Sequence, residues 1–322
     1  MSNINKKIGF SLKMAFANYG YLFILGFLII ISTILSPVFL TSGNIMNILR
    51  QMSITVIIAY GVTMIIISGM IDLSSGSVVA LSGVIGTSAF VLTGSPWVGL
   101  IVGIFVGACT GLFNGTVITV FNLPPFIVTL AMMTIARGLA LLYTGGYPII
   151  DIDAFTAFGK GFFLGIPIPV IIMLLVFVGV VILTKRTRFG RYIFAIGGNE
   201  EAAIASGINV KRMKIMVFTL NGALVGLAGV ILMSRINSGQ PAAGLMYELD
   251  AITMAVIGGT SLSGGIGSIT GTLVGGLIVG ILKNILNLTN VSPYWQQVLK
   301  GLIILIAVIM DVYTKSMQGS KK

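Results

Sequence analysis

The chain has 322 residues, of which 56% are hydrophobic and only 8% charged, and its mean hydropathy is +1.08. Because no soluble fold of this size could bury so much apolar side chain, the composition excludes a soluble enzyme, a disordered chain and a disulfide scaffold. The formal charge of +11 comes from 19 Lys and Arg against 8 Asp and Glu, and in so apolar a chain it indicates membrane topology rather than nucleic-acid binding. The chain has no histidine and a single cysteine, Cys109, so an internal disulfide is excluded.

Ten apolar segments come close to the length of about 20 residues that a helix needs to cross a bilayer. In chain order they are residues 19–39, 52–69, 73–92, 97–120, 126–142, 166–184, 215–233, 251–262, 269–286 and 298–312. The first follows Lys6, Lys7 and Lys13 as a signal peptide would, but no convincing cleavage site follows it, so we interpret it as a retained span. The segment 251–262 is too short to cross alone and is expected to be extended by its flanks, broken or re-entrant. The predicted fold is an all-α, polytopic membrane helical bundle of about ten transmembrane segments, one of them short or broken.

The basic residues predict which loops face the cytoplasm. Thirteen of the 19 lie before the first span, between the sixth and seventh, or after the last: Lys6, Lys7, Lys13, Lys185, Arg186, Arg188, Arg191, Lys211, Arg212, Lys214, Lys315, Lys321 and Lys322. Because basic loops are retained on the cytoplasmic side, the tails 1–18 and 316–322 and the loop 185–214 are predicted to be cytoplasmic. Residues 19–315 then form one transmembrane domain, with segments 144–165 and 234–249 facing outside.

Glycine recurs every four residues in the fourth span, and in part of the ninth. The positions are Gly99, Gly103, Gly107, Gly111 and Gly115, followed by Gly267, Gly271 and Gly275. A stripe without side chains lets another helix backbone approach closely, which is a main source of packing energy in lipid. Helix packing is the first interpretation, and a pathway lined by bare backbone is the alternative.

Polar residues interrupt the spans at a few points. Asp72 lies in the sequence IDLSSGS between the second and third spans. Either it caps the third span at the cytoplasmic end, with Ser74 and Ser75 in the first turn, or it faces a pathway or gate. Arg137 lies deep in the fifth span, where it either snorkels outward or pairs with a carboxylate. Uncharged polar groups are expected to join helices or to line the path of a hydroxyl-rich substrate: Asn114, Asn122, Thr129 and Asn221.

No motif in the chain supplies energy for uphill transport. A phosphate-binding loop would need GxxxxGK followed by Ser or Thr, and the glycine-rich run 258–265 has no lysine after it. A string of carboxylates within the spans, as in a proton relay, is also missing from the sequence. If the chain transports uphill, we therefore expect the energy to come from another chain.

The cytoplasmic loop predicts a short helix that would need a partner. Asn199 is a good N-cap, Glu200 and Glu201 fall in the first turn, and Gly207 is a natural stop. About two turns are too few for a stable isolated helix. The small face of Ala202, Ala203 and Ala205 suits a groove on a partner, and an idle surface helix is the alternative.

At this loop the sequence resembles a known family. Residues 197–208 are similar to the coupling loop of bacterial ABC sugar-import permeases of the ribose, xylose and galactose branch. Further stretches resemble the family in the same order: GMIDLS (69–74) with Gly76 and Ser77, PFIVTL (125–130) with ARG (136–138), TRFGR (187–191), ELDAI (248–252), and IGGTSL (257–262) with Gly264 and Gly265. The likeness covers nearly the whole chain, residues 20–312. Ser75 departs from the family, which usually has valine there, so standard packing beside Asp72 is in doubt.

The resemblance implies a permease subunit of an importer in the bacterial inner membrane, without an enzymatic site or a cofactor of its own. It implies a separate cytoplasmic ATPase that uses ATP and Mg²⁺, an extracytoplasmic sugar-binding protein, a second permease copy or close relative, and no nucleic acid. A monosaccharide of the ribose type is the expected cargo.

Three sets of site residues follow from that expectation. Those expected to couple to the ATPase are Asn199, Glu200, Glu201, Ala202, Ala203, Ser206 and Gly207. Those expected along the translocation path are Asp72, Ser74, Asn114, Phe126, Thr129 and Asn221. Those expected to dock the binding protein are Arg235, Asp151, Asp153 and Lys160, with Arg235 preferred because a guanidinium suits a carboxylate on the partner.

Other functions remain open from the residues. One is a permease of similar architecture for branched-chain amino acids or nucleosides. Another is an ion-coupled transporter or channel that works alone, for which Asp72 is the main argument. A membrane enzyme would need a catalytic cluster, which eight scattered acidic residues and one cysteine do not suggest. The sequence leaves open which sugar is carried and whether the second permease copy is identical.

Overall fold

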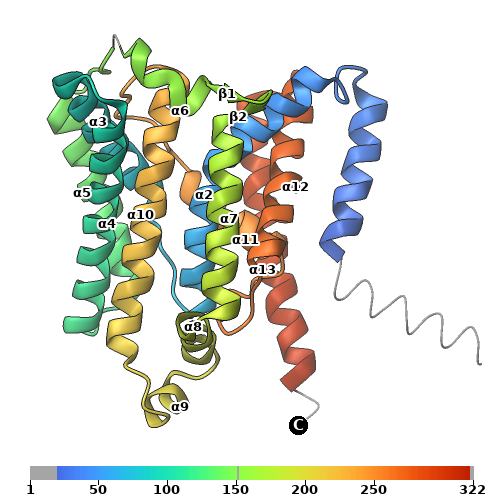
Figure 1. Ribbon diagram of the computed structural model, residues 1–322. Helices are drawn as coiled ribbons and strands as arrows, with labels where there is room; N and C mark the ends of the chain where they lie inside the picture. Colours follow the sequence, from blue (N-terminus) through green and yellow to red (C-terminus); the bar gives the residue numbers. More distant parts are fainter. Residues whose placement is uncertain (1–19, 151, 320–322) are drawn as a thin grey trace, which may run out of the picture.

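A computed structural model describes residues 20–150 and 152–319 of the chain (Figure 1). Most of the described chain is helical. The elements in order are the helix Gly20–Leu35, α2 (Ser42–Ile67), α3 (Ser75–Thr93), α4 (Pro96–Val120), α5 (Pro125–Thr144), η1 (Asp153–Thr156), α6 (Ala157–Lys160), β1 (Phe162–Phe163), β2 (Ile166–Pro167), α7 (Ile168–Arg186), α8 (Arg188–Gly198), α9 (Glu200–Ala205), α10 (Val210–Ile236), α11 (Tyr247–Ile257), α12 (Ile269–Leu288) and α13 (Pro293–Gly319). The two strands pair antiparallel, with Phe162 opposite Pro167.

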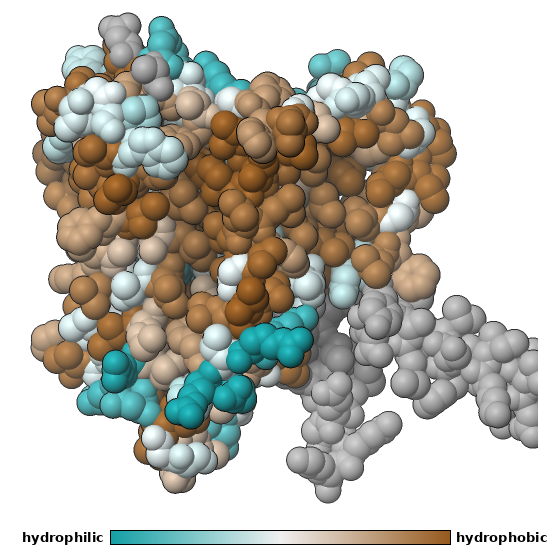
Figure 2. Space-filling view, viewed as in Figure 1, coloured by the Kyte–Doolittle hydropathy of each residue, from teal (hydrophilic) through white to brown (hydrophobic). Residues whose placement is uncertain are grey.

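Seven of the described helices are long and apolar enough to cross a membrane: α2, α3, α4, α5, α7, α10 and α12. Their apolar side chains form a wide belt between two more hydrophilic ends (Figure 2). The protein is therefore an integral membrane protein, and the predicted all-α bundle is confirmed. The predicted count of ten spans is loose. The other three predicted segments correspond to the shorter helix Gly20–Leu35, to α11 and to α13. α11 has only 11 residues, and it is the segment that was expected to be short.

α2 forms the centre of the bundle. Every residue from Met52 to Ile67 is buried, and α7, α10, α11 and α12 pack around the helix. A helix that is apolar on all sides is stable only when protein surrounds it, and the sequence of α2 is apolar on all sides over this length.

Glycines bring α4 and α10 into backbone contact. The two helices run antiparallel, so that Gly103 meets Gly226 and Gly107 meets Gly222. A Cβ atom at Gly107 would collide with the Gly222 carbonyl. Gly271 meets Gly258 in the same way where α12 contacts the end of α11. The glycine stripes therefore serve helix packing, as first interpreted.

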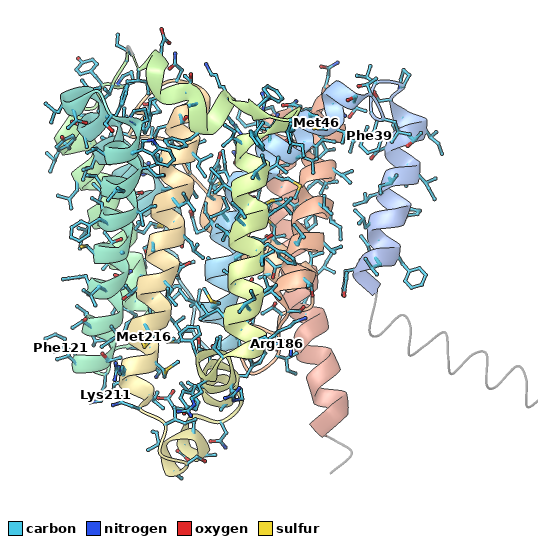
Figure 3. All side chains as sticks on the ribbon, in the orientation of Figure 1. Phe39, Met46, Phe121, Arg186, Lys211 and Met216 are labelled. Atoms are coloured by element: carbon cyan, nitrogen blue, oxygen red, sulfur yellow. The ribbon has the colours of Figure 1, made fainter. Side chains whose placement is uncertain are left out.

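The two ends of the bundle differ. α8 and α9 lie at one end, which we call the α9 end, while η1, α6 and the β1–β2 hairpin lie at the other, the hairpin end (Figure 1). Arg186 and Lys211 both lie at the α9 end, and Met46 lies at the hairpin end (Figure 3). The predicted tail 1–18 lies outside the described residues, and residues 316–319 of the other predicted tail belong to α13.

Candidate functional site

Asp72 lies at the centre of a buried polar cluster. Its side chain is 2% exposed, and Oδ1 accepts hydrogen bonds from the backbone N–H and the hydroxyl of Ser74 at 2.7 and 2.6 Å. Oδ2 accepts from the Ser75 hydroxyl at 3.0 Å and from Nδ2 of Asn221 at 2.6 Å. Four donors from its own turn and from α10 therefore hold this carboxylate, which is how a protein tolerates a charge at membrane depth.

The structure gathers four of the six predicted path residues in this cluster. Asn114 of α4 donates to the Ser74 hydroxyl at 3.1 Å, and Asn221 comes from α10, so the turn before α3 is joined to two helices. Thr129 lies beside the cluster, where its hydroxyl is 3.5 Å from the Ile71 carbonyl, but it bonds better to Pro125 in its own helix at 3.0 Å. Phe126 does not join the cluster; it is 50% exposed in the first turn of α5.

Asp72 precedes the first residue of α3, as expected, and it contacts Asn221, which lies twelve residues into α10. The turn therefore reaches into the bundle. There the amides of Asn221 and Asn114 donate to Asp72 and Ser74, and these hydrogen bonds replace the ones that the buried polar groups would otherwise make with water. Two amide oxygens of the cluster, Oδ1 of Asn114 and Oδ1 of Asn221, are buried without a hydrogen-bond partner among the described residues, and the Asn221 oxygen lies where a Cβ atom on Gly61 would be. The side of the membrane that this end of α3 faces stays a prediction.

A second charged cluster joins α11 to its neighbours, and the sequence analysis did not predict it. Asp250, 1% exposed, pairs with Lys283 of α12 at 2.5 Å and with Lys300 of α13 at 2.6 Å. Lys283 is the single charged residue of the apolar helix α12, which is the signal that could have indicated a buried carboxylate partner. This triad fixes the broken helix α11 between α12 and α13.

At the hairpin end, the predicted docking residues do not form one group. Arg235 lies in the last turn of α10 and lines a cavity of about 80 Å³ with Tyr247 and Lys283. Asp153 is exposed and accepts a hydrogen bond from Asn237 at 2.6 Å. Lys160 is exposed at the end of α6, and Asp151 lies outside the described residues.

At the α9 end, the predicted short helix is confirmed. Asn199 caps α9 by accepting from the Ala202 N–H at 2.9 Å, and Gly207 has a φ of +80° where the helix stops. Glu200 pairs with Lys214 of α10 at 2.7 Å. A cavity of about 540 Å³ lies beside this pair, between α9, the start of α10 and the turn after α4.

The small face of α9 is only partly available to a partner. Ala203 is 3% exposed because it packs inside the chain, whereas Glu200, Glu201, Ala202, Ala205, Ser206 and Gly207 are exposed. The exposed surface of α9 therefore begins with two acidic side chains and ends with small residues.

Comparison with known proteins identifies the family. The family described as "Branched-chain amino acid transport system / permease component" matches residues 44–308. The chain belongs to this permease family. It is 53% identical to the ribose import permease protein RbsC of Bacillus subtilis over 88% of this chain and 89% of that protein.

Two further relatives extend the comparison. The permease is 45% identical to the RbsC protein of Haemophilus influenzae over 92% of each chain. It is 41% identical to the L-arabinose transport system permease protein AraH of Escherichia coli over 95% of this chain and 94% of that protein. No solved structure matches the permease.

Proposed function

We propose that this chain is the membrane-spanning subunit of an ABC importer that carries a monosaccharide of the ribose type into the cell. The observation that carries the proposal is the 53% identity to a ribose import permease over nearly the full length of both chains. A second relative transports L-arabinose, so pentoses are the common cargo of the relatives described above. The family description alone would fit a branched-chain amino acid permease equally well, and the identities to sugar permeases favour the sugar.

In this proposal α9 is the contact for a cytoplasmic ATPase that uses ATP and Mg²⁺. The helix is short, capped and exposed, with Glu200 paired to Lys214 and Ala203 buried against the rest of the chain. A partner that binds its acidic start and its small residues could displace it together with α10. That displacement would bias the bundle between outward-open and inward-open arrangements.

The binding protein would dock at the opposite end. Asp153 and Lys160 are exposed there, and Arg235 offers a guanidinium in the cavity that it shares with Tyr247. A carboxylate on the partner is the matching group for Arg235. The permease would work with a second copy or a close relative in the bacterial cell membrane.

The buried cluster supports a structural function for Asp72 more than a direct contact with the sugar. Four hydrogen bonds occupy the carboxylate, and it is 2% exposed, so a passing substrate would have to break those bonds to reach it. The same enclosure weakens the alternative of an ion-coupled transporter that uses Asp72.

The test is reconstitution of the purified permease in liposomes, with and without its ATPase and binding protein. We expect accumulation of labelled D-ribose only when both partners and ATP are present. Labelled leucine and adenosine serve as competing cargoes. Accumulation of ribose by the permease alone under an ion gradient would refute the proposal, and ATP-driven uptake of leucine but not ribose would favour the amino acid alternative.

A further inference from the structure

Two charged residues of the membrane-spanning region belong to neither cluster described above. Arg137 is the thirteenth residue of α5, about 18 Å along the helix axis from its first residue. Glu248 lies in the first turn of α11, the short helix that begins inside the bundle. Each of the two lies in a stretch that resembles the permease family, and neither has a function in the proposal so far.

Each residue keeps part of its hydrogen-bonding capacity free. Nη1 of Arg137 donates to the carbonyls of Pro241 and Ala243 at 2.6 and 2.8 Å, which leaves the other guanidinium N–H groups without a hydrogen bond to the described residues. The Glu248 carboxylate lies against Gly76 in the first turn of α3, where a Cβ atom would collide with it. No described side chain donates a hydrogen bond to it.

The two side chains contact the same short stretch of chain before and at the start of α11. Arg137 donates to the Ala243 carbonyl, and the neighbouring Gly244 carbonyl lies against Gly76 together with the Glu248 carboxylate. The ion pairs within 4.0 Å among the described residues are Glu200–Lys214, Asp250–Lys283 and Asp250–Lys300, so the Arg137–Glu248 pair is further apart than that. An arginine donor and a carboxylate acceptor therefore lie near the same turn without forming an ion pair with each other.

Both side chains are partly exposed, and Arg137 lies within a membrane-spanning helix, where lipid would be the default neighbour. One face of α5 packs on α3 through Val128, Met132, Ala136 and Ala140, and Arg137 lies at the edge of that face. Leu139, on the opposite side of the edge, is 48% exposed. An ionised group that stays exposed in a span faces water or a polar ligand rather than hydrocarbon, because hydrocarbon would cost several kcal/mol.

We propose that Arg137 and Glu248 form a contact site for a neutral polyhydroxylated substrate on the translocation path. The inference rests on the proposed function and names the surface that such a substrate would touch. Neighbouring sugar hydroxyls donate to a carboxylate and accept from a guanidinium, so two such groups that are near one another but unpaired can bind the hydroxyls of a diol. The pair has no net charge, which suits a neutral ligand better than an anion.

The first test measures whether water reaches the side chain at position 248 and whether the sugar protects it. Because Cys109 is the single cysteine, Cys109→Ser provides a cysteine-free background for Glu248→Cys and for the control Leu139→Cys. In the complete importer in membranes, a charged thiosulfonate reagent should modify the cysteine at 248 and not the one at 139, which a lipid-soluble maleimide should reach. D-ribose with binding protein and ATP should slow the reaction at 248. Labelling of 248 no faster than of 139 would overturn the inference.

The second test separates substrate contact from folding. Glu248→Gln keeps the shape of the side chain beside Gly76 and removes its charge. We expect ribose uptake to fall about tenfold or more, which corresponds to one lost hydrogen bond to a charged group. The melting temperature of the variant in detergent and its co-purification with the ATPase should match those of the unmodified complex; a loss of either together with uptake would indicate a structural function and would count against the site. Unchanged uptake in Glu248→Gln would also overturn it. A wild-type complex that carries no ribose would refute the proposed function, while labelling at 248 would still show whether that position is accessible to water.

Discussion

At the scale of single residues, Asp72 shows how one carboxylate can organise a membrane protein. Its two oxygens join a turn to α10, and through Ser74 the same network reaches Asn114 of α4. The energetic reason is that each donor would otherwise be buried without a partner, at about 1–3 kcal/mol each. Charge and amide therefore stabilise one another, and replacing either one alone leaves a buried polar group without its partner.

The first prediction concerns this carboxylate. In Asp72→Asn one acceptor oxygen becomes an N–H₂ group that faces the donors of Ser75 and Asn221 or of Ser74. We expect the free energy of unfolding to fall by about 1.5–3 kcal/mol for each bond to the charged group that is lost. The measurement is the melting temperature of the purified permease in detergent.

A matched control for this substitution is Asp153→Asn. Asp153 is an exposed carboxylate with a hydrogen bond to Asn237, so the same chemical change should alter the melting temperature much less. If the two variants melt at the same temperature as the unmodified permease, the stabilising function of Asp72 is wrong.

At the scale of helices, glycine spacing sets how closely the helices approach. The second prediction compares two glycines in different helices. Gly107→Ala places a methyl group on the backbone of α10 at Gly222, whereas Gly179→Ala in α7 meets no atom within 4 Å. We expect Gly107→Ala to lower the free energy of unfolding by about 1–3 kcal/mol, as overpacking does, and Gly179→Ala to leave it unchanged or slightly higher. Equal melting temperatures of the two variants in detergent would contradict this account of the stripe.

The third prediction concerns α9. Glu200→Lys together with Ala202→Trp reverses the charge that pairs with Lys214 and adds bulk to the exposed small face. We expect the variant to lose its co-purification with the ATPase, because a docked surface tolerates neither change. Tyr147→Lys, which changes an exposed residue far away in the chain, serves as control and should retain the ATPase.

The interpretation of that experiment depends on folding of the variant. Its melting temperature should stay close to that of the unmodified permease, since an exposed ion pair contributes little to stability. ATPase retained at wild-type level by the variant would exclude α9 as the contact.

The helices also show what could be predicted from the sequence. Hydropathy predicted a span at residues 97–120, and the helix found there, α4, has the bounds Pro96–Val120. It missed the first ten residues of α2, which begins at Ser42 rather than 52, because Ser42, Asn44, Asn47 and Arg50 make that part polar. The capping pattern at Asn199 predicted α9 because a cap is a local interaction between neighbouring residues.

Interactions between distant residues could not be predicted in the same way. Asn221 donates a hydrogen bond to Asp72, 149 positions away in the sequence, and Asp250 forms ion pairs with lysines of two later helices. No local pattern encodes such a pairing, since it depends on how the helices are arranged around α2. For the same reason the sequence identified Arg235 as polar and basic but did not indicate the cavity that it lines.

At the scale of the whole molecule, charge distribution predicts orientation. The basic residues of the loop 185–214 gather at the α9 end, as Arg186 and Lys211 illustrate (Figure 3). Because basic segments are retained in the cytoplasm, we expect the α9 end to face inward and the hairpin end outward. An importer driven from inside requires the same orientation, since ATP is available only there.

The fourth prediction tests that orientation with the single native cysteine removed by Cys109→Ser. Ser206→Cys lies in the exposed end of α9, and Tyr147→Cys lies in the exposed turn after α5. A membrane-impermeant maleimide added to intact cells, with an outer membrane permeabilised where one is present, should label the cysteine at 147 and not the one at 206. After the cells are opened, both should react. Labelling of 206 in intact cells would place the acidic helix outside, where no ATPase could bind it, and both the orientation and the coupling function of α9 would then be wrong.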